Sequence, residues 1–580
     1  MKIMKKNYYK IICAIGAMCG LSSCGDFLDI EPRELVIEEQ FWNEKTDVDN
    51  VVAGCYEGLQ SYSVVTRMMA WGEFRSENVK VGQYAERDDL HMYKLINENI
   101  DAQNTYTNWS SFYTVINRCN TAIMKAPKVA AVDPSFTEGE LKATIAELSA
   151  LRDLCYFYLI RTFRDVPYST TAFTDDDQKM DLPATPFNDV LDSLITDLEA
   201  VQYDAVRKYP SDGDKALYQT GRITQDAIHA MLCEMYLWKQ DYQKCIDYAD
   251  MIIAAKQQEA RDQEGTLMSD MNTYFDGYPL IREWTNEADF FGNSYNEIFG
   301  TGNSDESIFE LTYMRNDNML ANSAVSTYYG NPDNGGFYNR VQPSDYIGLD
   351  VSNNVFKFFR NTLDARGHWS FNALTTTSTS SMIGKYVMST SIWEASGTTV
   401  KRSLAGTWTK DKNHSNWIIY RLTDIMLMKA EALVQLAADD ADAKVEEAFN
   451  LVNVVNRRNI MKEADKITAN DQLKFADYNT KDKMEELVME ERHRELLFEG
   501  KRWYDLVRRS LRDGNTQYLR TQLGNKGLKN AGIVSSKLTR MEAIFWPYNL
   551  DELKVNHNLT QNPAFGSGEN SSYENTATNQ

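Results

Sequence analysis

The chain divides into blocks according to the spacing of its apolar residues. From about 40 to 260, and again from about 415 to 510, apolar residues recur every three or four positions, which indicates amphipathic helices. The intervening residues 261–416 lose this period and are rich in Asn, Gly, Ser and Thr. Residues 566–580 carry no apolar pattern, and we expect them to be disordered. The pattern predicts a mainly α protein in which a loop-rich, irregular lobe is inserted between two helical blocks.

Two stretches of the helical blocks predict helix pairs. Residues 221–254 predict two helices joined at 239–241, with the small residues Cys233 and Cys245 placed 12 positions apart, as at the packing positions of a tetratricopeptide repeat. Residues 417–458 predict a second pair, with Ala430 and Ala448 near the crossing. Such pairs bury their apolar faces by stacking on one another. Residues 145–163 are so apolar that we expect a helix buried on most sides.

The N-terminus carries the features of an export signal. Four lysines and no acid precede the apolar run 11–21, which is shorter than the roughly 20 residues that span a bilayer. Leu21-Ser22-Ser23-Cys24 resembles a bacterial lipobox, although Ser23 replaces the commoner Gly or Ala. We therefore expect residues 1–23 to be a lipoprotein signal peptide and Cys24 to carry the acyl anchor. The alternative is an ordinary signal peptide that is cut nearby.

Composition disfavours several classes of function. The 580 residues carry a net charge of −22, which becomes −26 when the four lysines of residues 1–23 are removed, and such a charge repels nucleic acid. The six histidines form no HExxH pattern, and no P-loop, GxSxG, GxGxxG or EF-hand loop occurs. With 83 acidic residues in the chain, two carboxylates will lie close together by chance, so such a pair does not indicate a glycosidase. We expect no catalytic residues, no cofactor and no metal site.

Cysteine usage points to the core. Five of the eight cysteines follow Cys24, an odd number with no CxxC pair, which disfavours a disulfide scaffold. Four of them lie among apolar residues at helical spacing and are predicted to be small core residues, namely Cys119, Cys155, Cys233 and Cys245.

Aromatic residues concentrate in the polar lobe. Residues 271–340 hold 14 aromatics in 70 positions, or 20%, against 12% for the whole chain. Sugar rings stack on aromatic planes while their hydroxyls pair with polar side chains, so interleaved aromatic and polar residues are candidate contacts. The alternative is packing of an irregular lobe. The candidate ligand-binding residues are Glu77, Tyr84, Arg87, Tyr93, Asn97 and Asn104 in one stretch, and Trp284, Tyr295, Asn296, Tyr328 and Tyr329 in another. Trp71, Trp109 and Trp503 lie in helical motifs and are predicted to be core residues.

Four ordered segments resemble one known family. They are CGDFLDIEP at 24–32, WGEFRSENV at 71–79, YRLTDIML at 420–427 and RELLFEGKRWYDL at 494–506. Together they are similar to the SusD/RagB family of Bacteroidetes outer-membrane lipoproteins, over residues 24–565. Glu77 stands where the family more often has Asp, and the pattern weakens in the lobe, where such proteins vary and where ligands bind.

The resemblance implies both an architecture and a role. The architecture is about four tetratricopeptide-like helix pairs in a protein anchored by lipid to the outer membrane and facing the cell surface. The role is to bind a glycan, or in some members a peptide, and to deliver it as a hinged lid to a SusC-type TonB-dependent transporter, without catalysis. In such proteins the region after the second motif contacts ligand, and the motif at 494–506 is architectural, with Glu499 and Arg502 in buried ion pairs. Two other classes remain open: a surface glycoside hydrolase, and a scaffold whose helix pairs bind only protein.

Overall fold

The structure is a computed structural model that describes most of the chain between residues 41 and 566. The gaps lie at 83–84, 176, 211–216, 265–274, 283–294, 314–320, 331–339, 348, 351–354, 357, 361–363, 374–380, 387, 397–398, 408–412 and 462–466. The predicted signal peptide, Cys24, Tyr84, Trp284 and the tail from 567 onward lie outside the described residues.

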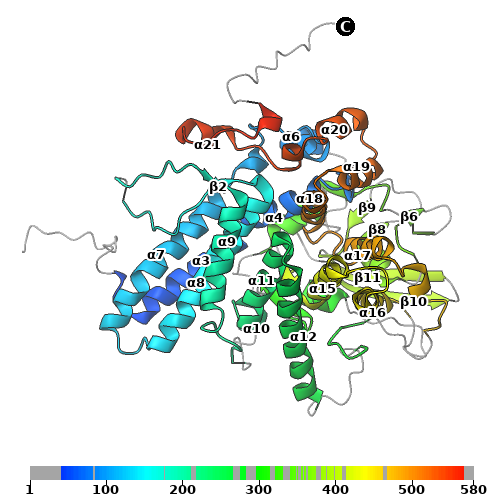
Figure 1. The fold of residues 1–580 in the computed structure, drawn as a ribbon, viewed down its shortest axis with the longest axis horizontal. Coiled ribbons are helices and arrows are strands. Elements are labelled where there is room, and N and C mark those ends of the chain that lie inside the picture. The colour runs from blue at the N-terminus through cyan, green and yellow to red at the C-terminus, as the bar shows by residue number, and fades with distance from the viewer. Residues whose placement is uncertain are drawn as a thin grey trace, which may run out of the picture.

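Long antiparallel helices stack side by side to form the body of the molecule (Figure 1). Four neighbouring pairs follow one another through the stack: α3 with α7, α8 with α9, α11 with α12, and α15 with α16. This arrangement confirms the predicted tetratricopeptide-like helix pairs. The helices of the stack are α3 (Lys45–Gln60), α4 (Tyr62–Met69), α7 (Ser110–Val132), α8 (Glu138–Phe163), α9 (Phe187–Val201), α10 (Tyr218–Gly221), α11 (Gln225–Lys239), α12 (Tyr242–Glu264), α15 (Leu422–Leu436) and α16 (Ala443–Arg458).

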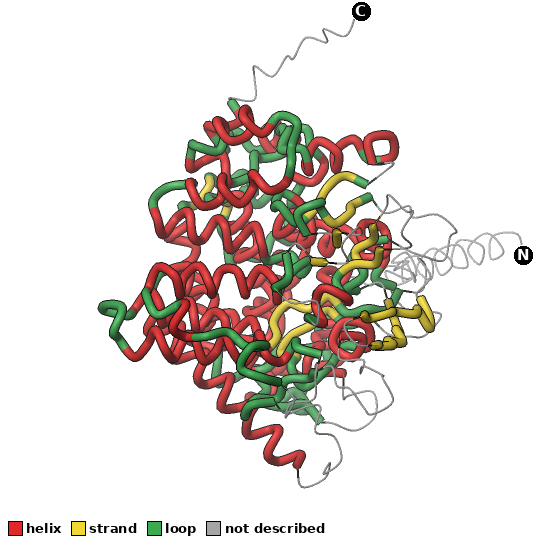
Figure 2. Tube along the Cα trace, turned by 90° about the vertical axis from the view of Figure 1, so that its right-hand side faces the viewer, coloured by secondary structure: helices red, strands yellow, loops and turns green. Residues whose placement is uncertain are grey.

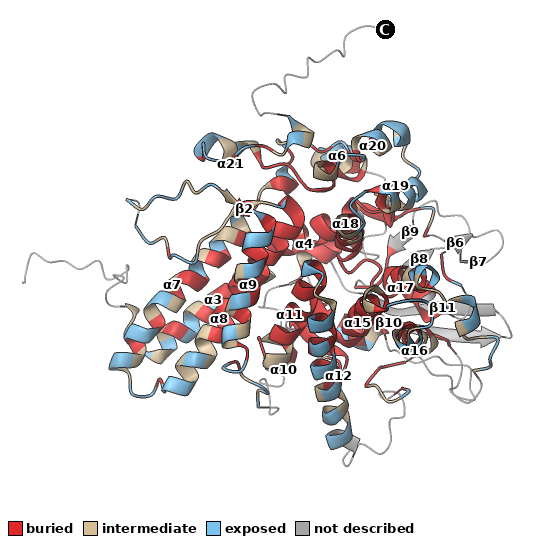
Figure 3. Ribbon diagram, in the orientation of Figure 1, coloured by how far each residue is buried: buried red, intermediate tan, exposed pale blue. Residues whose placement is uncertain are grey.

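Helix α8 packs between α7 and α9, and most of its length is buried, as its composition predicts. Its first turn is closed by a capping box in which Thr137 and Glu140 bond each other's backbone. Every residue from 146 to 163 is buried, and Figure 3 shows the surrounding helices buried on the sides that face the interior. A helix with no polar stripe is stable only where neighbours cover it on all sides.

The predicted hairpin at 221–254 is confirmed and runs ten residues further, to Glu264. Its turn rests on Gln240, which takes the left-handed conformation with φ 64°. Cys233 and Cys245 meet across the pair, with their Sγ atoms 3.6 Å apart, and all five described cysteines are buried free thiols. The spacing of 12 residues therefore marks the helix crossing.

The prediction of helix is wrong for residues 417–421, which form strand β12 (Trp417–Arg421). All five of its residues are buried, and the strand pairs antiparallel with β4 (Ser307–Leu311) from the lobe. The run Trp-Ile-Ile-Tyr has high strand propensity because its side chains are β-branched or aromatic. β12 pairs with a segment about a hundred residues earlier, and the spacing of apolar residues within a stretch does not reveal such a distant partner.

The strands pair in two-stranded antiparallel sheets, most of which involve the lobe and lie on one side of the helical body (Figure 2), whereas the pair at 166–167 and 184–185 lies within the first helical block. Apart from β4–β12, the pairs are β1 (Val79–Val81) with β5 (Val341–Pro343), β2 (Val166–Pro167) with β3 (Ala184–Thr185), β6 (Leu349–Asp350) with β7 (Val355–Phe356), β8 (Phe371–Ala373) with β9 (Ser381–Ile383), and β10 (Met388–Ser396) with β11 (Thr399–Thr407). The lobe also holds π-helix η4 (Asn296–Thr301), α13 (Ser323–Tyr329) and α14 (Ala365–Trp369). The prediction of a loop-rich lobe between helical blocks is confirmed.

The C-terminal helices begin beside α15 and α16, on which the first of them packs, and the last of them lie at one end of the body near α6 (Figure 1). They are α17 (Lys481–Glu495), α18 (Arg502–Asp513), α19 (Gln517–Leu523), α20 (Ala531–Lys537) and α21 (Leu550–Val555). The shorter elements beneath them are π-helix η1 (Ala70–Phe74), α5 (Ala85–Asp88), α6 (Leu90–Ile96) and 3₁₀-helix η2 (Thr105–Thr107). No helix in the described ranges has the length and apolarity needed to cross a membrane.

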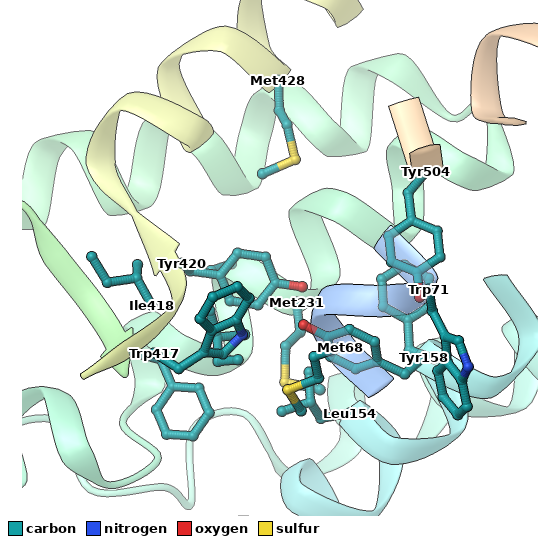
Figure 4. Packing of buried hydrophobic residues seen from close by; sticks show 14 of the residues in the cluster. Met68, Trp71, Leu154, Tyr158, Met231, Trp417, Ile418, Tyr420, Met428 and Tyr504 are labelled. Atoms are coloured by element: carbon teal, nitrogen blue, oxygen red, sulfur yellow. The ribbon is translucent and has the colours of Figure 1, made fainter. Parts of the chain in front are cut away.

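One hydrophobic core joins these parts. Figure 4 shows Met68, Leu154, Met231, Trp417 and Tyr504 packed together, although they come from five separate stretches of the chain. Trp71, Trp109 and Trp503 are buried in this core, as predicted. The core therefore fixes the positions of the loops that connect its helices, and through them the position of the site described next.

Buried ion pairs fasten the lobe and strand β12 to helix α17 and the residues that follow it. The Arg421 guanidinium contacts Glu495 at 2.7 Å and Glu499 at 2.8 Å, while Lys385 from the lobe contacts Glu499 at 2.6 Å. Arg366, also from the lobe, contacts Glu491 at 2.6 Å. Buried charges persist where they are paired in this way. The acidic run around residue 495 is thus largely structural.

Candidate functional site

Several residues predicted to contact ligand lie in the interior. Glu77 is fully buried, and its Oε1 accepts hydrogen bonds from Arg502 Nη2 at 2.5 Å and Nε at 2.9 Å. The prediction that Arg502 belongs to a buried ion pair is confirmed, and Glu77 is its partner. A ligand therefore has no access to Glu77 in this structure.

Three further predicted contacts serve the backbone or the core. Asn104 accepts a hydrogen bond from Tyr106 N at 3.0 Å and donates one to His91 O at 2.9 Å. Tyr329 is buried, and its hydroxyl donates to Phe498 O at 2.9 Å. Tyr295 is buried and donates to Asn459 Oδ1 at 2.9 Å. Their polar atoms are occupied by the fold, so the structure does not present these side chains to a ligand.

Other predicted contacts are at least partly exposed but are not gathered at one place. Arg87 on α5 pairs with Asp88 at 2.6 Å, and Tyr93 on α6 is half-buried. Asn97 ends α6, with its Nδ2 donating to Tyr93 O at 2.9 Å. Asn296 belongs to η4, in the lobe, and its Oδ1 has no hydrogen-bond partner among the described residues.

The two predicted stretches meet at Tyr328. Its hydroxyl lies 2.8 Å from the hydroxyl of Tyr106 and 3.0 Å from that of Tyr62. The rings of Tyr62 and Tyr328 are stacked, with centroids 6.3 Å apart. Tyr106 and Tyr328 are buried, whereas Tyr62 is 43% exposed. These three residues, from η2, α13 and α4, form what we call the tyrosine cluster.

The hydrogen bonds of the tyrosine cluster run in one direction. The Tyr106 hydroxyl donates to Asp89 Oδ2 at 2.6 Å, and a tyrosine has a single O–H donor. Tyr106 must therefore accept from Tyr328, which in turn accepts from Tyr62. Burial raises the pKa of Tyr106 and of Tyr328, so both hydroxyls stay protonated. The result is a fixed relay from Tyr62 to Asp89.

Arg340 holds the end of this relay. Its Nη1 donates to Asp89 Oδ2 at 2.9 Å, and its guanidinium carbon lies 5.7 Å from the centroid of the Tyr328 ring. Asp89 also caps α6 by accepting from Met92 N at 3.0 Å. The carboxylate is thus fully engaged as an acceptor and fixes the orientation of the cluster.

A polar cavity of about 560 Å³ is lined in part by Thr105, the residue before Tyr106. We call it the Arg67 cavity, and its lining consists of Arg67, Gln103, Thr105, Asn108, Ser110, Asn549, Leu550, Asp551 and Lys554. The Arg67 side chain borders both the cavity and the cluster, because its charge interacts with Tyr106, Tyr328 and Tyr62. The volume of the Arg67 cavity lies within the range typical of small-molecule sites.

Arg67 is held by neutral groups. Its Nη1 donates to Ser63 O at 2.9 Å and to Ser63 Oγ at 2.7 Å, and its Nε donates to Asn108 O. Its Nη2 makes a longer bond of 3.3 Å to Thr105 O. Partial burial lowers the pKa of Arg67, and the nearby tyrosines raise it, so the group remains cationic at neutral pH.

Two other cavities have a different character. One of about 680 Å³ is lined mainly by apolar residues, including Trp109, Tyr113 and Phe173, and it lies against the Glu552 and Val555 side of α21. Another, of about 490 Å³, lies over the motif at 494–506 and includes Arg494 and Arg502. Arg67 lines neither of these two cavities. In the described part of the chain, no group of three or more His, Cys, Asp or Glu side chains is arranged to hold a metal ion.

Sequence reasoning missed Tyr62 and Arg67, which both lie on the short helix α4. The apolar stripe of α4 consists of Val64, Val65, Met68 and Met69, all of them buried. Tyr62 precedes this stripe and lies between two serines. An aromatic residue outside the buried stripe of a short helix is the feature that could have revealed it.

Comparison with known proteins gives a consistent result. The model of the SusD family matches residues 305–565, and a model described as "Starch-binding associating with outer membrane" matches residues 26–237. The chain is 26% identical to SusD-like protein P38 of Formosa agariphila, over 96% of this chain and 97% of that protein.

Solved structures share the fold. A SusD superfamily protein from Bacteroides vulgatus superposes with a TM-score of 0.62 at 19% identity, covering 90% of this chain and 100% of that one. A laminarin-binding SusD-like protein superposes with a TM-score of 0.60 at 20% identity, covering 90% of this chain and 99% of that one.

Proposed function

The chain belongs to the SusD/RagB family, and from that premise we propose that it binds a glycan at the cell surface. The observation that carries the proposal is the exposed ring of Tyr62, which is fixed by the tyrosine cluster on the same helix as Arg67, a residue that lines a polar cavity. An aromatic platform beside hydrogen-bonding groups suits sugars, whose C–H faces stack while their hydroxyls are bound. The fold shared with a laminarin-binding SusD-like protein supports this class of ligand.

The proposal includes a place and a partner. Cys24 carries the acyl anchor, which holds the domain on the outer face of the outer membrane. The protein acts as a lid on a SusC-type TonB-dependent transporter and passes the bound glycan to it. A lid needs binding and release but no bond cleavage, so the protein is not an enzyme. Asp89 fits this role, because it is engaged by Tyr106 and Arg340 rather than available for proton transfer.

Affinity electrophoresis of the mature domain tests glycan binding. Gels containing single polysaccharides, beginning with laminarin, are run with the unaltered protein, Tyr62→Ala and Tyr203→Ala. Tyr203 is the matched control, because it is 68% exposed and lies at the end of α9, outside the tyrosine cluster. We expect retention by at least one polysaccharide, loss of retention in Tyr62→Ala, and unchanged retention in Tyr203→Ala.

The same preparations distinguish the proposed glycan-binding lid from the alternative functions. Release of reducing ends from a retained polysaccharide would identify a hydrolase. Retention of peptides and not of glycans would favour the same lid role for a different cargo. Co-purification of a large outer-membrane barrel from detergent extracts supports the lid, and its repeated absence would contradict it.

A further inference from the structure

The charge of Arg67 is not balanced by its surroundings. Its hydrogen bonds go to three backbone carbonyls and one serine hydroxyl, and no carboxylate of the described residues pairs with it. A partly buried cation without a counter-charge is unfavourable, and proteins normally pair such groups. The missing negative charge is therefore a feature that a ligand could supply.

Other cations near the site do have acidic partners. Arg340 pairs with Asp89 at 2.9 Å, and Lys554 pairs with Asp551 at 2.9 Å. Because Asp551 is taken by Lys554, it does not neutralise Arg67. The lining of the Arg67 cavity carries Arg67, Lys554 and Asp551, a net charge of +1. The whole chain has a net charge of −22, so this cavity differs in sign from the rest of the protein.

The geometry leaves one edge of the guanidinium available. Nε and Nη1 are held by Asn108 and Ser63, whereas Nη2 makes only the 3.3 Å bond to Thr105 O, on the exposed side. Planar guanidinium groups bind carboxylates and sulfates through such nitrogens, with charge-assisted hydrogen bonds. The exposed ring of Tyr62 lies on the same helix and interacts with the same guanidinium through the tyrosine cluster.

We propose that the Arg67 cavity binds the anionic group of an acidic glycan, while a sugar ring of that glycan stacks on Tyr62. The shared chemistry is an oxyanion on a sugar, either the carboxylate of a uronic acid or a sulfate ester. This inference rests on the proposed glycan-binding function and specifies the substrate class. Gln103 and Asn108 line the same cavity and provide polar groups for the neighbouring hydroxyls.

Matched pairs of glycans test the proposal. Oligogalacturonate is compared with its carboxyl-reduced form, and a sulfated galactan is compared with its desulfated form, by calorimetry on the mature domain. We expect one charged form to bind at least about tenfold more tightly than its neutral counterpart, which is the range of one charge-assisted contact. The affinity should fall as salt concentration rises. The pair that shows the difference tells carboxylate from sulfate.

Variants assign the effect to Arg67. Arg67→Gln should bind the charged and neutral forms equally, while Arg67→Lys should keep part of the preference. Arg118→Gln is the control for loss of one positive charge, because Arg118 is an exposed arginine on α7 that likewise donates to a carbonyl, Gly54 O, at 2.8 Å. If Arg67→Gln is unstable, Arg67→Lys and the salt dependence carry the test.

The outcomes separate the inference from the proposed function. Equal binding of charged and neutral forms by the unaltered protein, with loss of both in Tyr62→Ala, would overturn the acidic ligand and keep glycan binding. A preference for the charged form that survives in Arg67→Gln would also overturn the assignment. Failure to bind any glycan of this set or of the electrophoresis panel would overturn both proposals.

Discussion

Gly72 and Gly500 meet backbone to backbone at the centre of the molecule. A Cβ atom on Gly72 would lie 1.8 Å from the carbonyl oxygen of Gly500, which no real structure tolerates. Gly500 itself has φ +72°, a conformation that favours glycine. This contact joins the segments 71–79 and 494–506, two of the four motifs by which the family is identified. The two glycines thus have a packing reason that follows directly from the fold.

Gly72→Ala should strongly destabilise the protein. The new methyl group meets backbone, which cannot move aside as a side chain can, so we expect a loss of roughly 3 kcal/mol or more in the free energy of unfolding. Gly54→Ala is the control, since a Cβ there meets nothing within 4 Å. Gly54 lies inside α3, where alanine is favoured by about 0.5–1 kcal/mol. Urea denaturation measures both, and equal effects of the two changes would contradict the close approach.

Glu77→Gln should lower stability without lowering glycan affinity. The change leaves the buried Arg502 guanidinium without its counter-charge, which costs about 3 kcal/mol. Glu138→Gln breaks an exposed pair with Lys142 instead, and should cost far less stability than the loss of the buried pair. Denaturation gives the stability, and affinity electrophoresis below the unfolding temperature gives the binding. A stable variant that no longer binds glycan would restore Glu77 as a ligand contact.

Stability should depend on pH through Glu73. Burial raises the pKa of this carboxyl from 4.5 to about 7, although it accepts hydrogen bonds from Asn78 and Gly500. Between these two values the folded state holds a proton that the unfolded state releases. Glu73 should therefore contribute a fall of roughly 3 kcal/mol to the free energy of unfolding as pH rises from about 4.5 to about 7, whereas the buried His229, whose pKa is lowered to about 4, contributes a rise.

Glu73→Gln removes this titration, so the difference in the free energy of unfolding between this variant and the unaltered protein should change by roughly 3 kcal/mol across the same window. Glu57→Gln changes an exposed residue of α3 and should leave the profile parallel to the original. Urea denaturation in steps between pH 4.5 and 7.5 makes the comparison. A Glu73→Gln profile with the original slope would assign the pH dependence to other groups.

Tyr328→Phe should weaken glycan binding while the protein stays folded. The change keeps the ring that stacks on Tyr62 but removes the hydroxyl between Tyr62 and Tyr106. Without that hydroxyl, Tyr62 keeps its exposure and loses its orientation, so we expect a several-fold loss of affinity and a loss of about 1 kcal/mol in stability. Tyr236→Phe, whose hydroxyl bonds Glu199 on another part of the stack, is the control. If both variants bind alike, the relay does not position Tyr62.

Much of the fold could be predicted from the sequence because helical period is local. The pair α11–α12 and the buried helix α8 follow from the spacing of their own apolar residues. The exception is β12, whose strand exists because β4 lies beside it. Local patterns report which residues are apolar, but they do not report which distant segment will pair with them.

The site was harder to predict, because some polar residues of one stretch are buried while others are exposed. Glu77 pairs with Arg502 inside the protein, whereas Arg87 lies on the surface. The sequence indicates that both are charged, but only the positions of α18 and α5 decide which is covered. Tyr328 was predicted to contact ligand directly, and the structure instead places it under Tyr62, where it fixes the exposed ring.

The direction of the tyrosine relay sets what the site can accept. Since the single proton of the Tyr62 hydroxyl is given to Tyr328, the oxygen of Tyr62 has only lone pairs to offer a ligand. A sugar hydroxyl must then supply the proton for that bond, and an O-methylated sugar of the same shape cannot. The partly buried carboxylate of Asp89, at the far end of the relay, would thereby make the proposed site distinguish a free hydroxyl from its methyl ether.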